Sequence, residues 1–204
     1  MHLDIGRVRV NLSFTFAAVV TLMLLLCKEE IVIASLFSSL FHEGGHLFFM
    51  LVFSDAPESI IFGAFGIRIE RSDGVCLSYK KEAVIALGGI IGNLILAFLS
   101  ILFYYFSNSS VCFGFFCVNV FVAAFNLLPV RQLDAGRFAE CMLRSAFAAS
   151  AVDGVLRFIN LFTVSFLLVG CILYNIYVGL NVSLIAVTVY LIFISILKEF
   201  NNDK

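Results

Sequence analysis

Six apolar segments leave little of this 204-residue chain for anything but membrane-spanning structure. A helix needs about 20 consecutive, mostly apolar residues to cross a lipid bilayer. Segments of about this length cover approximately residues 10–27, 31–53, 83–106, 111–128, 155–177 and 180–197. Hydrophobic residues make up 62% of the chain and charged residues 13%, which is too little polar surface for a water-soluble domain. We therefore predict an all-α polytopic membrane protein with six transmembrane helices, forming a single domain over residues 1–204.

The distribution of charge supports six spans and predicts their orientation. An even number of spans places both termini on the same side of the membrane. If that side is the cytoplasm, every one of the 13 Lys and Arg residues except Lys28 lies inside or at the inner boundary. Positive charges accumulate in cytoplasmic loops, so we expect the N- and C-termini to be cytoplasmic. The net charge of −1 and the absence of a basic run argue against a nucleic-acid partner.

Two segments on the inner side are not apolar enough to span. Between the second and third spans, residues 60–81 alternate apolar and polar side chains at Ile67–Glu70, turn at Ser72–Gly74 and continue as an apolar run over residues 75–78. Period-two alternation around Asp-Gly predicts a membrane-associated β-hairpin, although a surface loop is the alternative. Residues 129–153 begin with a helix-breaking proline and continue as a short amphipathic stretch, which suits a helix lying in the inner interface.

The second span contains the pattern H-E-x-x-H at residues 42–46. Residues i and i+4 share one face of a helix, so His42 and His46 can reach a single metal ion. Zinc binds imidazole nitrogen, and Glu43 stands where it can take a proton from a water molecule. Ionisable groups at membrane depth are costly and are candidates for function. The alternative is that these side chains only form hydrogen bonds between helices.

A catalytic zinc ion usually has three protein ligands, so one more is expected. The remaining acidic residue in a buried context is Asp134, which follows Pro129 in the segment N-L-L-P-V-R-Q-L-D-A-G, residues 126–136. Proline opens the backbone at that point, and irregular backbone at membrane depth is tolerated where it lines a cavity. The alternative is that Asp134 caps the following helix.

These motifs together resemble the site-2 protease family of intramembrane zinc metalloproteases. The resemblance rests on residues 42–46, on N-x-x-P-x-x-x-L-D-x-G from Asn126, and on the glycine-rich stretch 86–93 of the third span. It covers about half of the chain. The small size resembles the compact bacterial and archaeal branch, which includes the sporulation protease that processes a membrane-tethered sigma-factor precursor.

The resemblance implies a role for each matching residue. His42, His46 and Asp134 match the three zinc ligands of the family, Glu43 its general base, and Asn126 a position that contacts substrate. The hairpin after the second span matches a β element that engages substrate. Two positions depart from the usual family pattern: Ala135 replaces a glycine and Ile90 replaces a proline. Ala135 could crowd the backbone at a place where glycine relaxes it.

The predicted activity is that of a zinc metalloendopeptidase with one Zn²⁺ per chain. It would cut a peptide bond within or next to a transmembrane segment of a membrane-tethered protein, in a bacterial cell membrane and under the control of a membrane regulator. Two alternatives stay open. One is an inactive pseudoprotease that only binds membrane segments, and the other is a metal or ion transporter that uses the same polar side chains. The sequence names neither the substrate nor the cleavage point.

Overall fold

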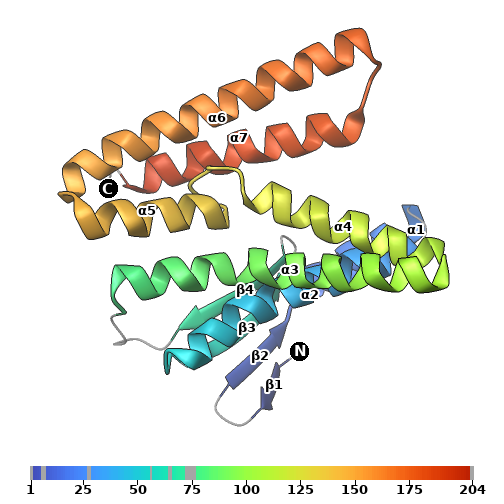
Figure 1. Ribbon diagram of the computed structural model, residues 1–204. Coiled ribbons are helices and arrows are strands. Elements are labelled where there is room, and N and C mark those ends of the chain that lie inside the picture. Colours follow the sequence, from blue (N-terminus) through green and yellow to red (C-terminus); the bar gives the residue numbers. More distant parts are fainter. Residues whose placement is uncertain are drawn as a thin grey trace. The chain divides into compact units, whose positions relative to one another are not determined.

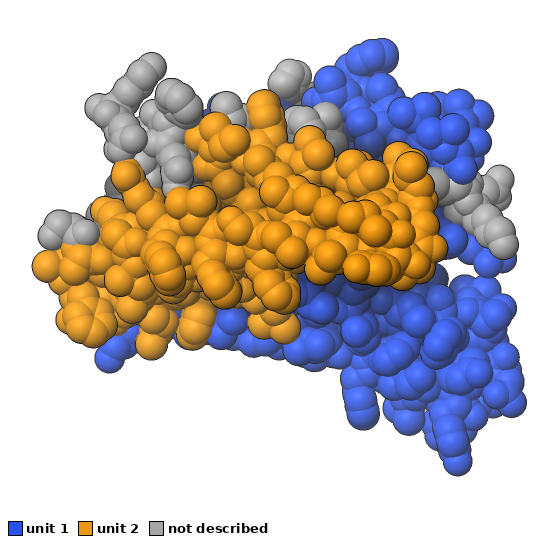
Figure 2. All heavy atoms as spheres, turned by 90° about the horizontal axis from the view of Figure 1, so that it is seen from above, with its two compact units in different colours: residues 1–125 blue, residues 126–204 orange. Residues whose placement is uncertain are grey.

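The computed structural model describes residues 2–5, 8–26, 29–55, 57–63, 66–71 and 77–202. This described part forms two compact units, Met1–Phe125 and Asn126–Lys204, shown in blue and orange in Figure 2. Each unit has its own set of internal contacts, and the single domain over residues 1–204 stays a prediction. The elements along the chain (Figure 1) are β1 His2–Ile5, β2 Val8–Leu12, α1 Phe14–Leu26, α2 Glu29–Val52, β3 Pro57–Gly63, β4 Gly66–Arg71, α3 Tyr79–Ser107, α4 Ser110–Asn126, α5 Asp134–Ala146, α6 Ala149–Tyr177 and α7 Val182–Asn202.

A helix lies at each of the six predicted spans. Three of them contain a segment that is long and apolar enough to cross a membrane, namely Glu30–Val52 of α2, Tyr79–Ser107 of α3 and Ala151–Tyr177 of α6. The apolar parts of α1, α4 and α7 are shorter. At 1.5 Å per residue, the 13 residues of α1 extend about 20 Å, against about 30 Å for the hydrocarbon core. The all-α membrane architecture is confirmed, whereas six complete crossings stay a prediction.

In the first unit, α2 and α3 form the most extensive contact between helices. Glycines allow their backbones to approach closely. A Cβ atom added at Gly45 would lie 2.1 Å from the carbonyl oxygen of Gly88, and one added at Gly88 would lie 2.5 Å from that of Gly45. No side chain fits at such a separation, so the crossing requires glycine on both helices. This crossing places the polar residues of α2 directly beside α3.

The same unit contains a four-stranded sheet in the order β1-β2-β3-β4. The outer pairs, β1–β2 and β3–β4, are antiparallel, while β2 and β3 run parallel. Parallel strands need a long crossover connection, which α1 and α2 supply here. The sheet therefore joins the beginning of the chain to the segment that follows α2.

The predicted β-hairpin between α2 and α3 is confirmed, but the strand that pairs with Ile67–Glu70 precedes it in the sequence instead of following it. Ile67–Glu70 does lie in a strand, β4, yet its antiparallel partner is the preceding strand β3, with Ile60 opposite Ile69 and Phe62 opposite Ile67. The predicted turn at Ser72–Gly74 lies outside the described residues, and residues 77–78 lie outside any strand. Residues 59–62 contain two isoleucines and a phenylalanine, and so form a strand more readily than residues 75–78, which contain one valine as their β-branched residue.

The start of the first predicted span is also corrected. Residues 10–12 belong to strand β2, and helix α1 begins only at Phe14. Valine and leucine suit a strand as well as a buried helix, so their apolar character did not distinguish the two. Pairing with β3, which lies far along the chain, determines the outcome.

In the second unit, an irregular segment at residues 127–133 leads into α5, and α5 packs against α6. Helix α5 has a strongly polar face and lies within the predicted amphipathic stretch. Buried Arg131 donates to Glu140 of α5 at 3.3 Å and to Asp153 of α6 at 3.0 Å. Arg144 pairs with the same two carboxylates, at 3.0 and 2.8 Å. This four-residue ion cluster ties the irregular segment to both helices.

Candidate metal centre

Helix α2 presents His42 and His46 one turn apart and buries both, with 8% and 7% of their surface exposed. Each imidazole is held at its Nδ1 atom. The Nδ1 atom of His42 lies 2.9 Å from Oδ1 of Asn93, and that of His46 lies 2.7 Å from the carbonyl oxygen of Ile85. Both partners are on α3 and both oxygens can only accept, so each Nδ1 carries the proton.

The backbone N–H of Gly89 also lies 3.3 Å from Nδ1 of His46. We assign the proton to Nδ1, because the contact with the carbonyl oxygen is shorter and a carbonyl cannot donate. In the neutral rings, Nε2 of both histidines is then the nitrogen that accepts and that can bind a metal ion. This is the tautomer that a metal-binding histidine adopts when its other nitrogen is hydrogen-bonded.

The two Nε2 atoms face each other at 3.3 Å. Zn–N bonds of about 2.0–2.1 Å in tetrahedral geometry require about 3.3–3.4 Å between two ligand nitrogens, so the pair fits a shared zinc ion. Gly89 of α3 lies against this pair. A Cβ atom there would stand 2.5 Å from Nε2 of His46 and 2.6 Å from Nε2 of His42. Only glycine at this position of α3 allows both imidazole rings to lie this close to the helix.

The structure also describes the other three predicted site residues, Glu43, Asn126 and Asp134. Glu43 is half-buried on the same turn of α2 as His42. Asn126 ends α4 and is half-buried. Asp134 is the first residue of α5 and is buried, and the N-cap of that helix is Leu133. The alternative role of Asp134 as the cap of α5 is thus not what the structure shows.

The departure at Ala135 causes no backbone strain. Ala135 lies within helix α5, and among the described residues only Ser54 and Asn108 have positive φ without being glycine. The glycine that is needed in this motif is Gly136, where an added Cβ atom would lie 2.0 Å from the carbonyl oxygen of Val130. The family-like glycine is therefore retained at the position where the irregular segment folds back onto α5.

Sequence reasoning missed the polar residues that surround His42. Asn93 of α3 donates from Nδ2 to Oγ of Ser38 on α2 at 2.7 Å and to Oδ1 of Asn119 on α4 at 3.1 Å. Ser38 in turn donates to Asn119 at 2.9 Å. The signal was present as isolated polar residues within three apolar segments, but no spacing along the chain connects them.

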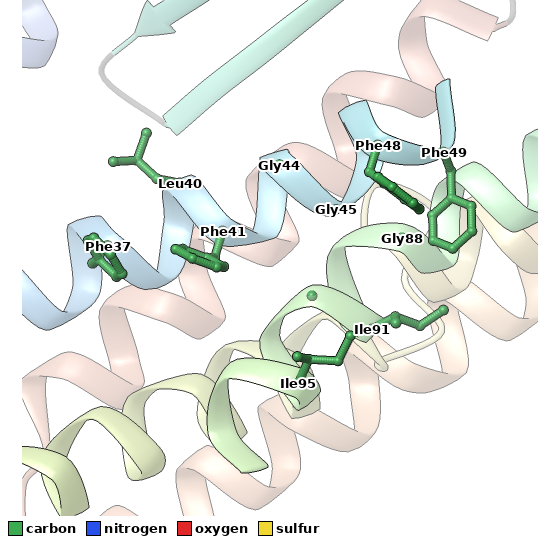
Figure 3. A pocket seen from close by; sticks show the side chains of 11 residues that line it. Phe37, Leu40, Phe41, Gly44, Gly45, Phe48, Phe49, Gly88, Ile91 and Ile95 are labelled. Atoms are coloured by element: carbon green, nitrogen blue, oxygen red, sulfur yellow. The ribbon is translucent and has the colours of Figure 1, made fainter. Parts of the chain in front are cut away.

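A groove of about 620 Å³ runs between α2 and α3 (Figure 3), and neither His42 nor His46 lines it. Phenylalanine, leucine, isoleucine and glycine line it, and no titratable side chain does. We place the candidate site at the histidine pair and not in the groove, because the groove offers no group that could bind a metal or transfer a proton.

The apolar helices and the histidine pair together define a helical membrane protein with a candidate metal centre. Among solved structures, the chain is similar to the site-2 protease from Methanocaldococcus jannaschii, with a TM-score of 0.67 and 18% sequence identity over 96% of this chain and 93% of that one. The chain thus has the site-2 protease fold, as its motifs predict. No protein-family model and no curated protein matches the sequence.

Proposed function

We propose that this chain is an intramembrane zinc endopeptidase of the site-2 protease family. It would hydrolyse a peptide bond within or next to a transmembrane segment of a membrane-tethered protein. The observation that carries the proposal is the histidine pair, whose Nε2 atoms face each other at 3.3 Å with Glu43 on the same helix. The likeness in fold to a site-2 protease supports the same reading.

The proposed ligands are His42, His46 and Asp134, which are all buried. Two imidazoles and one carboxylate form a donor set that suits catalytic zinc and leaves a position for water. When bound, zinc supplies a Lewis acid that polarises the scissile carbonyl and lowers the pKa of a coordinated water molecule. Glu43 accepts a proton from the attacking water at its carboxylate and then delivers it to the amine of the leaving peptide.

Substrate must reach the site as an extended strand, because the carbonyl groups of a helix are already hydrogen-bonded. Strand β4 is at the edge of the described sheet and can bind an extended segment by β-addition. Asn126 is proposed to contact the substrate near the scissile bond. The expected location is a bacterial cell membrane, with both termini in the cytoplasm and a membrane regulator as a further partner.

The first test measures zinc per chain in detergent-purified protein. We expect about one tightly bound ion in the wild type and its loss in His46→Ala and Asp134→Ala, because two protein ligands bind zinc much more weakly than three. His2→Ala is the matched control, since it removes the third histidine of the chain and should leave zinc bound. Glu43→Gln should retain zinc but lose cleavage of a single-span model substrate.

Two results would overturn the proposal. A wild-type protein without zinc would exclude a metalloprotease, and zinc retained in Asp134→Ala would exclude the ligand set. Bound zinc together with unchanged cleavage by Glu43→Gln would remove Glu43 from the mechanism. Metal content that rises with bath concentration, without a stoichiometric limit, would instead favour a transporter.

A further inference from the structure

We infer that Asn93 is a positioning residue that holds His42 in the tautomer and orientation needed for metal binding, and that Ser38 and Asn119 lock Asn93 in turn. The inference rests on the proposed function and extends it to residues outside the H-E-x-x-H motif. These three residues come from α3, α2 and α4, and each is 0% exposed. Burying polar side chains at membrane depth costs free energy, so three buried polar residues that bond to one another point to a function.

The contact with His42 has one chemical interpretation. Oδ1 of Asn93 lies 2.9 Å from Nδ1 of His42, and an amide oxygen cannot donate. The proton is therefore on Nδ1, and Nε2 presents its lone pair toward Nε2 of His46. Hydrogen bonds of this kind fix the ring orientation of metal ligands and raise their basicity.

The orientation of the Asn93 amide is itself determined by its neighbours. Its Nδ2 atom donates to Oγ of Ser38 at 2.7 Å and to Oδ1 of Asn119 at 3.1 Å, and it also lies 3.4 Å from the carbonyl oxygen of Ser38. A flipped amide would place an oxygen against Oδ1 of Asn119, and both atoms can only accept. Ser38 donates to Asn119 at 2.9 Å, and Nδ2 of Asn119 donates to the carbonyl oxygen of Phe115 at 2.8 Å. The hydrogen bonds therefore run in one order, from His42 to Asn93, Ser38, Asn119 and finally the carbonyl oxygen of Phe115.

The two histidines differ in how they are held. His46 donates to a backbone carbonyl, that of Ile85, which no substitution removes. His42 depends on a side chain, which can be replaced. Asn93 is thus the point at which the geometry of the histidine pair can be altered without changing a ligand.

The test must separate positioning from simple packing between helices. Asn93→Leu removes the acceptor for His42, while Asn93→Asp keeps an acceptor and, like leucine, loses both donors to Ser38 and Asn119. Ser100→Ala is the matched control, because it removes another buried polar side chain of α3 whose hydroxyl bonds only within its own helix, to the carbonyl oxygen of Leu96. All variants are made in the full-length chain.

The first readout is the ¹⁵N NMR spectrum of the histidine rings in metal-free protein at alkaline pH, which reports the tautomer directly. Only three histidines are present, and His42→Ala assigns the signal. We expect the Nδ1–H tautomer of His42 in the wild type, Asn93→Asp and Ser100→Ala, and a mixture of tautomers in Asn93→Leu. A wild-type ring with its proton on Nε2, or an unchanged ring in Asn93→Leu, would overturn the inference.

The second readout is zinc affinity by chelator competition, together with the visible spectrum of the Co²⁺-loaded protein. Asn93→Leu should bind zinc about 10- to 100-fold more weakly, and Asn93→Asp should recover most of that loss. Equal losses in both variants, in proportion to their loss of thermal stability, would leave only a packing role. If the wild type binds no zinc, the proposed function fails, whereas zinc bound normally by Asn93→Leu removes only the positioning role.

Discussion

The site depends on the absence of a side chain at Gly89 of α3. A methyl group added at this position would come within 2.6 Å of the Nε2 atoms of both His42 and His46. The neighbouring atoms are the ends of two side chains, which can rotate away. A substitution here therefore acts on the histidine pair before it acts on the fold.

We predict that Gly89→Ala loses bound zinc while the helical circular dichroism of the protein is preserved. The new methyl group displaces both rings from the geometry that a shared ion requires. The control is Gly44→Ala, which lies inside the H-E-x-x-H motif but adds a Cβ atom with nothing within 4 Å. It should keep zinc and gain up to about 1 kcal/mol of helix stability. Full zinc content in Gly89→Ala would contradict the assigned site.

The ion cluster of Arg131, Glu140, Arg144 and Asp153 connects three elements: the irregular segment at residues 127–133, α5 and α6. Burial raises the pKa of Glu140, but its hydrogen bonds with Arg131 and Arg144, and the charges of these residues, outweigh burial and bring the pKa below the ordinary 4.5. A carboxylate with a lowered pKa in the folded state stabilises the fold above the ordinary value. That stabilisation is lost as the pH falls through the lowered pKa.

We predict that Glu140→Gln is less stable than the wild type at neutral pH by on the order of 2 kcal/mol, because Arg131 and Arg144 lose a charged acceptor. The difference should shrink as the pH falls from 4.5 through the lowered pKa, because the carboxylate is protonated first in the unfolded state and then in the folded state. Thermal unfolding in detergent across this pH range measures it, with Glu30→Gln on an exposed residue of α2 as the control. A difference that does not change with pH would show that Glu140 does not stabilise the fold through its charge.

Patterns between neighbouring residues predicted the features that depend on neighbouring residues alone. The helices followed from long apolar runs, and the histidine pair from a spacing of four residues on one helix. Strand β2 was missed because its residues continue an apolar run and its partner β3 comes about fifty residues later. The network of Ser38, Asn93 and Asn119 was missed for the same reason, since three separate helices contribute one residue each. Non-local pairing left no periodic signal in either case.

Membrane orientation belongs to the whole molecule, and α3 gives a direct way to measure it. Its 29 residues extend about 43 Å, so its two ends can lie on opposite sides of a bilayer. Lys80 near its beginning and Ser110 just beyond its end are both exposed. The predicted orientation places Lys80 in the cytoplasm and Ser110 outside.

We predict that a membrane-impermeant maleimide added to intact cells labels Ser110→Cys and not Lys80→Cys, above the background of the native cysteines. After permeabilisation, both variants should be labelled, which confirms that both thiols are accessible. The opposite pattern would reverse the orientation inferred from the positive charges. Labelling of both variants in intact cells would show that α3 does not cross the membrane.

The parallel pairing of β2 with β3 has a consequence for biosynthesis. Residues 8–12 leave the ribosome first, but their partner, residues 57–63, is translated only after α1 and α2. At about 5–20 residues per second, β2 waits for seconds without the neighbour that completes its hydrogen bonds. The sheet can therefore close only after both α1 and α2 have been synthesised.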